Sequence, residues 1–321
     1  MNHQGTSRRE FLAAGGLGTL GLAAIAQPAA AKAAQELPER KFYMLLSCGR
    51  IGAKASFRES IDLAVKYGFE GIDPSAQYFS RLSDDELMRL LDELKAKKLR
   101  LGAAGLPVDF RKDEATFNEG LKKLPAVGAT LEKAGVTRVS TWIMPCSNDL
   151  TYPQNFRSHA SRLRQCAIIL QDHGQRLGLE YVSPKTLWTS QKQPFLHTLS
   201  ETKELLVAIG TDNLGVQLDS WHWFNAGETE ADLLTLRNQD VVTVDLNDAP
   251  AGIPLDKQVD SARELPAVTG VIPVKVFLDA LRKIGYDGPI QAEPFNAALR
   301  AMPTDQAVAA TAAAMKKALA L

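Results

Sequence analysis

Cysteine is scarce in this chain, which has three in 321 residues. Cys48, Cys146 and Cys166 are an odd number and include no CxxC pair. This pattern predicts neither a disulfide framework nor a thiolate zinc site, and we expect buried free thiols. Histidine is also rare, with five residues in the whole chain. A site built from several histidine ligands is therefore not expected.

An excess of basic residues is missing as well. The chain carries 37 Lys and Arg against 37 Asp and Glu. Removing residues 1–33 takes away three basic residues and one acidic residue, which leaves a formal charge of −2. Proteins that bind a phosphate backbone usually show a basic excess or a basic stripe. The composition therefore predicts no nucleic-acid partner.

Long apolar runs are absent too. The weakly apolar stretch 13–26 is too short and too rich in Gly and Ala for a stable membrane insertion. It follows a twin-arginine pattern, Arg8-Arg9, and precedes a small-residue cleavage site around 29–33. These features predict a twin-arginine signal peptide over residues 1–33. We expect the twin-arginine export machinery as a partner and a periplasmic location, with residues 34–321 forming a single catalytic domain.

From residue 41 onward, short apolar segments alternate with helical patterns. The expected strands are 42–47, 69–73, 100–105, 137–143, 179–183, 215–219, 241–246 and 289–293. The helical patterns cover 56–68, 83–98, 116–135, 158–178, 201–210, 229–238, 274–285 and 305–321. Strand and helix alternation predicts parallel pairing, and eight repeats favour an α/β fold closed as a (β/α)8 TIM barrel. The longest irregular stretch, 247–270, follows the seventh strand and is expected to serve function.

Four acidic residues stand where predicted strands end: Glu180, Asp219, Asp245 and Glu293. Side chains alternate between the two faces of a strand, and the positions just before each acid put the apolar residues on the opposite face. In a parallel barrel the apolar face meets the helices and the other face looks into the barrel. Four converging carboxylates repel one another unless a cation holds them. The sequence therefore predicts a divalent-metal site with these four residues as ligands.

Several motifs together resemble the xylose isomerase-like TIM barrel family, which includes sugar isomerases and epimerases. They are CGRIG, GFEGID, LGLEYVSPKTL, LDSWHWFNAG, VDLNDAPAGIPLDKQ and GYDGPIQAEPF, and the resemblance covers about residues 40–320. It implies one divalent ion held by Glu, Asp, His and Glu at the ends of strands five to eight. Glu180, Asp219 and Glu293 match three of these ligands. Asp245 stands where the family has His.

This departure leaves the role of Asp245 open. Three roles are open: Asp245 binds the metal directly, it holds a metal-bound water, or it contributes nothing to the site. An all-oxygen ligand set favours Mn²⁺ or Mg²⁺ over Zn²⁺. Four carboxylates also carry more negative charge than one divalent ion neutralises. A carboxylate that keeps a proton would resolve this excess.

Four further residues are candidates for substrate binding: His222, Lys185, Trp221 and Trp188. His222 follows Asp219 by three residues, as in the DxxH pattern of the family, where the histidine usually contacts substrate. The alternative for His222 is a loop histidine whose hydrogen bonds are satisfied by neighbouring groups. The alternative for Lys185 is a lysine that caps a solvent-facing loop. The tryptophans lie near the acidic positions in sequence, where aromatic rings stack on sugars or exclude water.

The resemblance implies a metal-dependent sugar isomerase or epimerase acting on a small carbohydrate. Glu180 and Glu293 are the expected acid and base that move the proton α to the carbonyl, through an enediolate. The alternatives are a lyase or dehydratase that eliminates from a keto-sugar or 3-keto-glycoside, and a non-catalytic exported sugar-binding barrel. A homo-oligomer is compatible with the sequence, which does not decide the oligomeric state.

Overall fold

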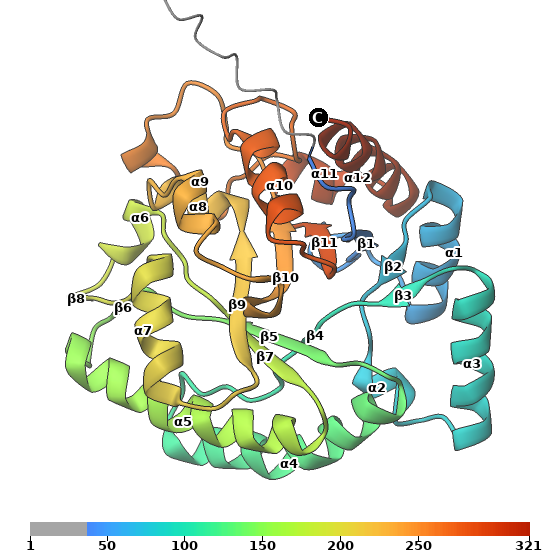
Figure 1. Cartoon of the computed structure of the whole chain (residues 1–321), viewed down its shortest axis with the longest axis horizontal. Coiled ribbons are helices and arrows are strands. Elements are labelled where there is room, and N and C mark those ends of the chain that lie inside the picture. The colour runs from blue at the N-terminus through green and yellow to red at the C-terminus, as the bar shows by residue number, and fades with distance from the viewer. Residues whose placement is uncertain (1–36) are drawn as a thin grey trace, which may run out of the picture. The chain divides into compact units, whose positions relative to one another are not determined.

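Parallel strands form the centre of the molecule. A computed structural model describes residues 37–321, and Figure 1 shows their arrangement. The strands are β1 Tyr43–Leu46, β2 Gly71–Ile72, β3 Arg100–Leu101, β4 Ala104–Gly105, β5 Arg138–Trp142, β7 Arg176–Glu180, β9 Leu214–Asp219, β10 Val241–Leu246 and β11 Pro289–Ala292. In these residues they build one nine-stranded sheet in the order β3-β2-β1-β11-β10-β9-β7-β5-β4, with every pair parallel.

The two edges of this sheet belong to the same short segment. β3 pairs with β2 and β4 pairs with β5, and only Gly102 and Ala103 separate β3 from β4. The predicted third strand, 100–105, is therefore split in two. A side chain at Gly102 would overlap Leu45 of β1, so the chain comes very close to β1 where the split occurs. The ring thus has eight strand positions, which confirms the predicted TIM barrel.

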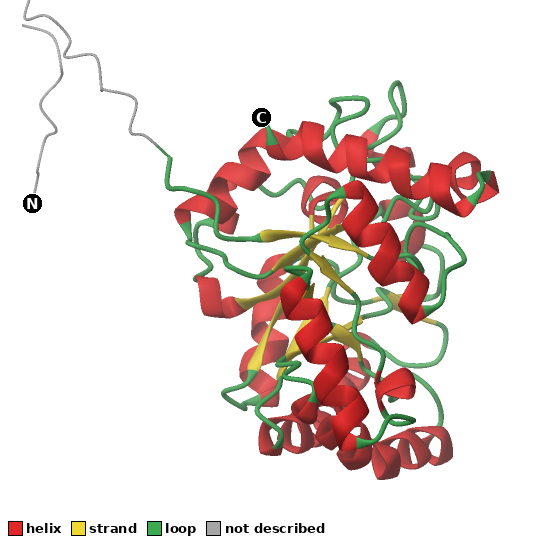
Figure 2. Cartoon of the chain, turned by 90° about the vertical axis from the view of Figure 1, so that its right-hand side faces the viewer, coloured by secondary structure: helices red, strands yellow, loops and turns green. Residues whose placement is uncertain are grey.

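Helices surround the strands (Figure 2). The longer ones are α1 Phe57–Tyr67, α3 Asp84–Ala96, α4 Glu114–Lys133, α5 Tyr152–Asp172, α7 Leu199–Ile209, α10 Val274–Lys283 and α12 Thr304–Leu319. Short elements are α2 Ala76–Phe79, α6 Lys185–Trp188, α8 Ser220–Asn225, α9 Glu230–Leu233, α11 Ala297–Ala301, β6 Cys146–Ser147, β8 Gln193–Pro194, and the 3₁₀ turns η1 Asn238–Asp240 and η2 Leu255–Lys257. Within residues 37–321, no helix combines the length and the apolar character needed to cross a membrane.

Local sequence signals explain several helix ends. Ser56 and Ser83 each accept a hydrogen bond from the backbone N–H three residues later, and the glutamate at that position bonds back. These capping boxes satisfy N–H groups that have no partner inside the helix. At the other end, α1 and α7 stop at Gly68 and Gly210, whose φ angles of 73° and 67° favour glycine.

Several predicted boundaries differ from the structure, and the helix expected over 229–238 is only α9, Glu230–Leu233. The helix expected over 158–178 begins at Tyr152, because Thr151 and Gln154 form a capping box there. The fifth strand was expected over 179–183 but runs over Arg176–Glu180, in register with β5. The residues after Glu180 leave the sheet for other partners, and Ser183 N–H donates to His222. Glu180 is therefore the last residue of its strand.

The core follows the predicted alternation with one exception in β10. The register between β9 and β10 shifts between Val241 and Thr243, which marks an irregularity at Val242. A Cβ atom added at Gly178 of β7 would lie 2.8 Å from Val242 Cβ, and one at Gly215 of β9 would lie 3.0 Å from Val242 Cγ2. Val242 therefore fills the barrel interior above two glycines. The alternation of the sequence predicts that Val242, like Val244, faces the helices, and for Val242 this prediction is wrong. The three cysteines are free and buried, as expected.

Candidate active site

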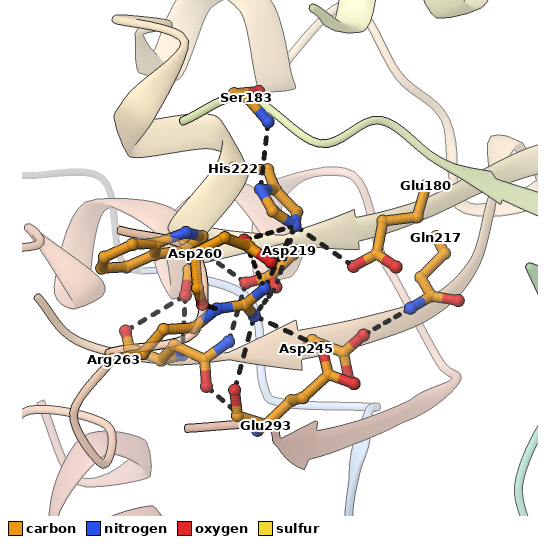
Figure 3. A network of polar contacts seen from close by, with 12 residues as sticks. Glu180, Ser183, Gln217, Asp219, His222, Asp245, Asp260, Arg263 and Glu293 are labelled. Carbon is orange, nitrogen blue, oxygen red and sulfur yellow. Dashed lines mark hydrogen bonds and ion pairs between the residues drawn. The ribbon is translucent and has the colours of Figure 1, made fainter. Parts of the chain in front are cut away.

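The four acidic residues converge at the carboxyl ends of neighbouring strands. Glu180 ends β7, Asp219 ends β9, Asp245 lies in β10, and Glu293 directly follows β11. One carboxylate oxygen from each lies within 4.8 Å of the others. Asp219 and Asp245 have no exposed surface, and Glu180 and Glu293 are 5% and 9% exposed. Figure 3 shows the four side chains directed toward one another.

Arg263 enters this cluster from the long loop after β10. Its Nη1 donates to Asp219 Oδ2 at 2.7 Å and to Glu293 Oε2 at 3.3 Å. Its Nη2 donates to Asp260 Oδ1 at 2.9 Å, and its Nε donates to the Asp260 carbonyl. The side chain is 2% exposed. The expectation that this loop is functional thus gains a specific residue, which the sequence analysis missed.

Arg50 also reaches the cluster, from the loop after β1. Its Nη1 donates to Glu293 Oε1 at 2.5 Å and to Asp245 Oδ2 at 3.2 Å. Its side chain is 25% exposed. The sequence analysis also missed this residue, although Arg50 is part of the CGRIG motif. An arginine at the end of the first strand was the one signal that could have identified it.

Two amides position the carboxylates. Gln217 Nε2 donates to Asp245 Oδ2 at 2.7 Å. Asn247 Nδ2 donates to Asp219 Oδ1 at 2.9 Å, and Asn247 Oδ1 accepts from the Glu293 N–H at 3.0 Å. Asn247 lies two residues after Asp245 and is fully buried. It therefore ties the ligand candidates of β9 and β11 together, and the sequence analysis did not single it out.

Two carboxylate oxygens in the cluster are buried and have no hydrogen-bond partner among the described residues. They are Glu180 Oε1 and Asp245 Oδ1. Leaving a buried acceptor unsatisfied is costly, and a carboxylate more so. A hard divalent cation takes oxygen ligands of this kind. The donor set therefore fits a divalent metal held by Glu180, Asp219, Asp245 and Glu293.

Burial also shifts the acid strength of the cluster. Burial, together with the charges of Glu293, Asp245 and Asp219, raises the pKa of Glu180 well above its ordinary value. Burial raises the pKa of Asp219 to about 7, although Arg263 opposes this shift. Burial likewise raises the pKa of Asp245 to about 6 against the charge of Arg50. A bound proton or a nearby cation stabilises each of these carboxyl groups, because both reduce the cost of buried negative charge.

His222 of α8 borders the cluster on the side of Glu180. Its Nδ1 accepts from the Ser183 N–H at 3.2 Å, and its Nε2 lies 3.7 Å from Glu180 Oε1 and 3.8 Å from Asp219 Oδ2. Burial, with the charge of Arg263, lowers the pKa of His222 well below its ordinary value, so the ring is neutral. A neutral ring that accepts at Nδ1 carries its hydrogen on Nε2, facing the carboxylates. Arg263 Nη2 also lies 3.4 Å from Nε2, and because arginine only donates, it does not accept this hydrogen.

The other candidate substrate residues lie apart from the cluster or below its surface. Lys185 and Trp188 line a separate pocket of about 360 Å³. Lys185 is exposed, and its Nζ is 4.0 Å from Asp256 Oδ2. Trp188 stacks on His197 at 4.6 Å between ring centroids. Trp221 is fully buried beneath the guanidinium of Arg263, which lies 5.5 Å from its ring centroid, so the structure gives it no exposed face for a sugar.

A family model described as xylose isomerase-like TIM barrel matches residues 61–318. The chain belongs to this family. Inosose isomerase of Bacillus velezensis is 22% identical to it over 248 residues, which are 75% of this chain and 84% of that protein. Inosose isomerase of Bacillus subtilis is 22% identical over 259 residues, 79% of this chain and 89% of that protein.

Solved structures of the xylose isomerase-like TIM barrel family share the fold. A xylose isomerase domain protein from Alicyclobacillus acidocaldarius superposes with a TM-score of 0.76 at 28% identity, covering 87% of this chain and 98% of that one. The IOLI protein, crystallised with a binding zinc atom, superposes with a TM-score of 0.72 at 18% identity, covering 87% and 98%. In both cases the likeness extends over nearly the whole barrel.

Proposed function

We propose that this protein is a sugar isomerase or epimerase that depends on a divalent metal. The observation that carries the proposal is the convergence of four buried carboxylates, two with unpartnered oxygens, inside a barrel of this family. The inosose isomerases among its relatives support a small carbohydrate as substrate. A structural neighbour, D-psicose 3-epimerase from Clostridium cellulolyticum H10, was solved with D-tagatose and has the same fold at a TM-score of 0.64.

Glu180 and Glu293 are the proposed proton-transfer groups. They belong to β7 and the end of β11, which β9 and β10 separate in the sheet. The two carboxylates therefore reach the mouth from different sides, as acid and base do when one removes a proton and the other returns it on the opposite face. Burial keeps the pKa of Glu180 high, so this group holds a proton readily. It is suited to serve as the acid.

The residues next to the carboxylates are proposed to bind the substrate and to hold the surrounding loop in place. His222 presents its Nε2 hydrogen toward the space between Glu180 and Asp219, where it can donate to a substrate hydroxyl. Arg263, held by Asp219 and Asp260, fixes the loop over the mouth. A bound divalent cation supplies positive charge that stabilises negative charge developing on a substrate oxygen. The all-oxygen ligand set favours Mn²⁺ or Mg²⁺ for this role.

Solvent exchange tests this function directly. The Mn²⁺-loaded protein is incubated with inososes and ketoses in D2O, and products are read by NMR. Deuterium at the carbon next to the carbonyl, together with a new isomer, is the expected result. Glu180→Gln and Glu293→Gln should each lower the exchange rate by about 10²–10⁴-fold, the usual contribution of a positioned acid or base.

Asp256→Asn is a matched control, because Asp256 is an exposed carboxylate on the loop near the mouth. It should leave the rate unchanged. Release of water or an aglycone in place of a new isomer would identify a lyase instead. Sugar binding without any exchange would identify a binding protein and end the proposal.

We also propose export through the twin-arginine machinery. Arg8 and Arg9 carry this proposal, and residues 1–33 lie outside the residues that the structure describes. Arg8→Lys with Arg9→Lys keeps the charge but removes the twin-arginine pattern. The variant should stay in the cytoplasm while the unchanged protein reaches the periplasm, as cell fractionation and immunoblotting would show. Equal distribution of both proteins would contradict export by this route.

A further inference from the structure

The charges at the cluster leave a definite remainder. The four carboxylates Glu180, Asp219, Asp245 and Glu293 carry four negative charges when ionised. Arg50 and Arg263, both within hydrogen-bonding distance of the cluster, carry two positive charges. Counted over these six side chains, the remainder is two negative charges, which one divalent cation cancels. Asp260, which also pairs with Arg263 at 2.9 Å, is left out of this count because its side chain is 26% exposed and solvent screens its charge. Without Arg50 the remainder would be three.

Arg50 is the arginine that reaches Asp245, and the same Nη1 also donates to Glu293 Oε1 at 2.5 Å. Asp245 Oδ2 accepts from Arg50 Nη1 at 3.2 Å and from Gln217 Nε2 at 2.7 Å, while Oδ1 stays unpartnered among the described residues. One oxygen of Asp245 is thus bound by donors and the other is directed elsewhere in the buried cluster. Arg263, in contrast, reaches Asp219, Glu293 and Asp260 but not Asp245. The extra acid on β10 therefore has a counter-charge, which it shares with Glu293.

We propose that Arg50 is a positioning residue that compensates the charge of Asp245 and so tunes the four-carboxylate cluster to a divalent cation. In this arrangement Arg50 holds Oδ2 of Asp245 and leaves Oδ1 for the metal. Asp245 stands where the family resemblance implies a histidine, and Arg50 offsets the negative charge that this acid adds. The inference rests on the proposed metal dependence, but it concerns how the charge of the site is set and does not depend on which sugar is converted.

Charge compensation makes a specific prediction for a set of variants. Asp245→Asn alone lowers the remaining negative charge to one and should weaken Mn²⁺ binding at least tenfold, because a ligand charge is lost. Arg50→Gln alone raises it to three and should bind Mn²⁺ no more weakly than the wild type. The double variant restores a remainder of two. It should bind Mn²⁺ within threefold of the wild type, although it lacks both charged groups.

Calorimetric titration of the purified full chain with MnCl2 measures these affinities without any sugar. A double variant that binds more than threefold weaker than the wild type would overturn the inference. So would an Arg50→Gln variant as weak as Asp245→Asn, because Arg50 would then act only by holding the ligands in place, with no contribution from its charge. If Arg50→Gln does not fold, Arg50→Lys decides, since it keeps the charge and should keep wild-type affinity; a tenfold loss would refute compensation.

Arg111→Gln is the matched control. Arg111 pairs with Asp109 at 3.2 Å and takes no part in the acidic cluster, so its loss should leave Mn²⁺ affinity unchanged. The test separates the two proposals. A wild-type protein that binds no Mn²⁺ defeats the proposed metal dependence itself. A wild-type protein that binds Mn²⁺ while the double variant fails defeats only the role of Arg50.

Discussion

Burial decides the chemistry of individual acids in this protein. Asp219 and Asp245 are fully buried, and their pKa values rise to about 7 and about 6. Exposed carboxylates behave in the opposite way when they cap helices, as Glu59 shows: its hydrogen bonds to Ser56 lower its pKa. A side-chain carboxyl group therefore holds its proton to higher pH inside the barrel than on the surface.

We predict that Mn²⁺ affinity rises with pH between about 5.5 and 7.5. The metal needs ionised carboxylates, and the raised pKa values of Asp219 and Asp245 mean that protons compete for them in this range. Each displaced proton contributes up to about tenfold per pH unit below the pKa of its group. Titration calorimetry at several pH values, in buffers of different ionisation enthalpy, measures both the affinity and the released protons. A pH-independent affinity would contradict the buried, proton-holding carboxylates.

At the scale of elements, the long loop after β10 is organised by one buried carboxylate. Asp248 Oδ1 accepts from the N–H groups of Ala249 and Ile272, at 2.8 and 2.9 Å. Asp248 Oδ2 accepts from those of Thr269 and Gly270, at 2.9 and 2.7 Å. The side chain therefore joins the start of the loop to its end. Arg263 lies on the segment between the start and the end of this loop.

Asp248→Ala should lower the free energy of unfolding by about 2–4 kcal/mol, because it leaves several N–H groups without an acceptor. It should also loosen Arg263 and weaken metal binding. Urea unfolding measures the loss of stability, and limited proteolysis of the loop measures how far the segment that carries Arg263 has loosened. Asp256→Ala on the same loop is the control, since Asp256 is exposed and should change stability by less than about 0.5 kcal/mol. Equal stability of the two variants would contradict the role of Asp248.

The barrel floor gives a second prediction for an element. Gly178→Ala should destabilise the protein by about 1–3 kcal/mol, because a Cβ atom there would lie 2.8 Å from Val242 Cβ in a packed interior. Gly105→Ala in β4 is the matched control, with no atom within 4 Å of the added Cβ. Chemical denaturation of both variants measures the difference. Similar stabilities would mean that Val242 does not pack over Gly178.

At the scale of the whole molecule, the acidic cluster and its arginines link distant parts of the chain. Arg50 and Glu293 are separated by 243 residues in sequence, and Arg263 and Asp219 by 44. The proposed cation, bound between β7, β9, β10 and β11, would therefore stabilise contacts that exist only in the folded barrel. Binding to the folded state alone raises stability by mass action.

We predict that Mn²⁺ at a hundred times its Kd stabilises the protein by about 2.7 kcal/mol. The corresponding rise in Tm is roughly 4–5 °C for a domain of this size. Thermal unfolding with excess Mn²⁺ and with EDTA measures the shift. Asp219→Asn should lose most of it, because it removes a central ligand. An unchanged Tm in the wild-type protein would argue against a metal site in the barrel mouth.

The periodicity of the sequence was enough to predict the barrel and the convergence of the four acids. Strands alternate side chains with a period of two, and parallel strands of one barrel end on the same side. The place of Glu180, Asp219, Asp245 and Glu293 therefore follows from local patterns once the barrel is accepted. The ends of strands are harder to predict from local patterns. The predicted fifth strand lies three residues too late, because residues 181–183 continue a strand-like pattern although they lie outside the sheet, where Ser183 N–H donates to His222.

Only the tertiary structure decided what surrounds the acids. The contacts of Arg50 and Arg263 join loops to strands across the barrel, and no local pattern encodes such pairings. The irregularity at Val242 depends on two glycines in neighbouring strands, and the burial of Trp221 depends on the loop that carries Arg263 over it. Short-range periodicity thus determined the scaffold and its carboxylates. Long-range packing determined their counter-charges, because a charge finds its partner only when the chain has closed into a ring.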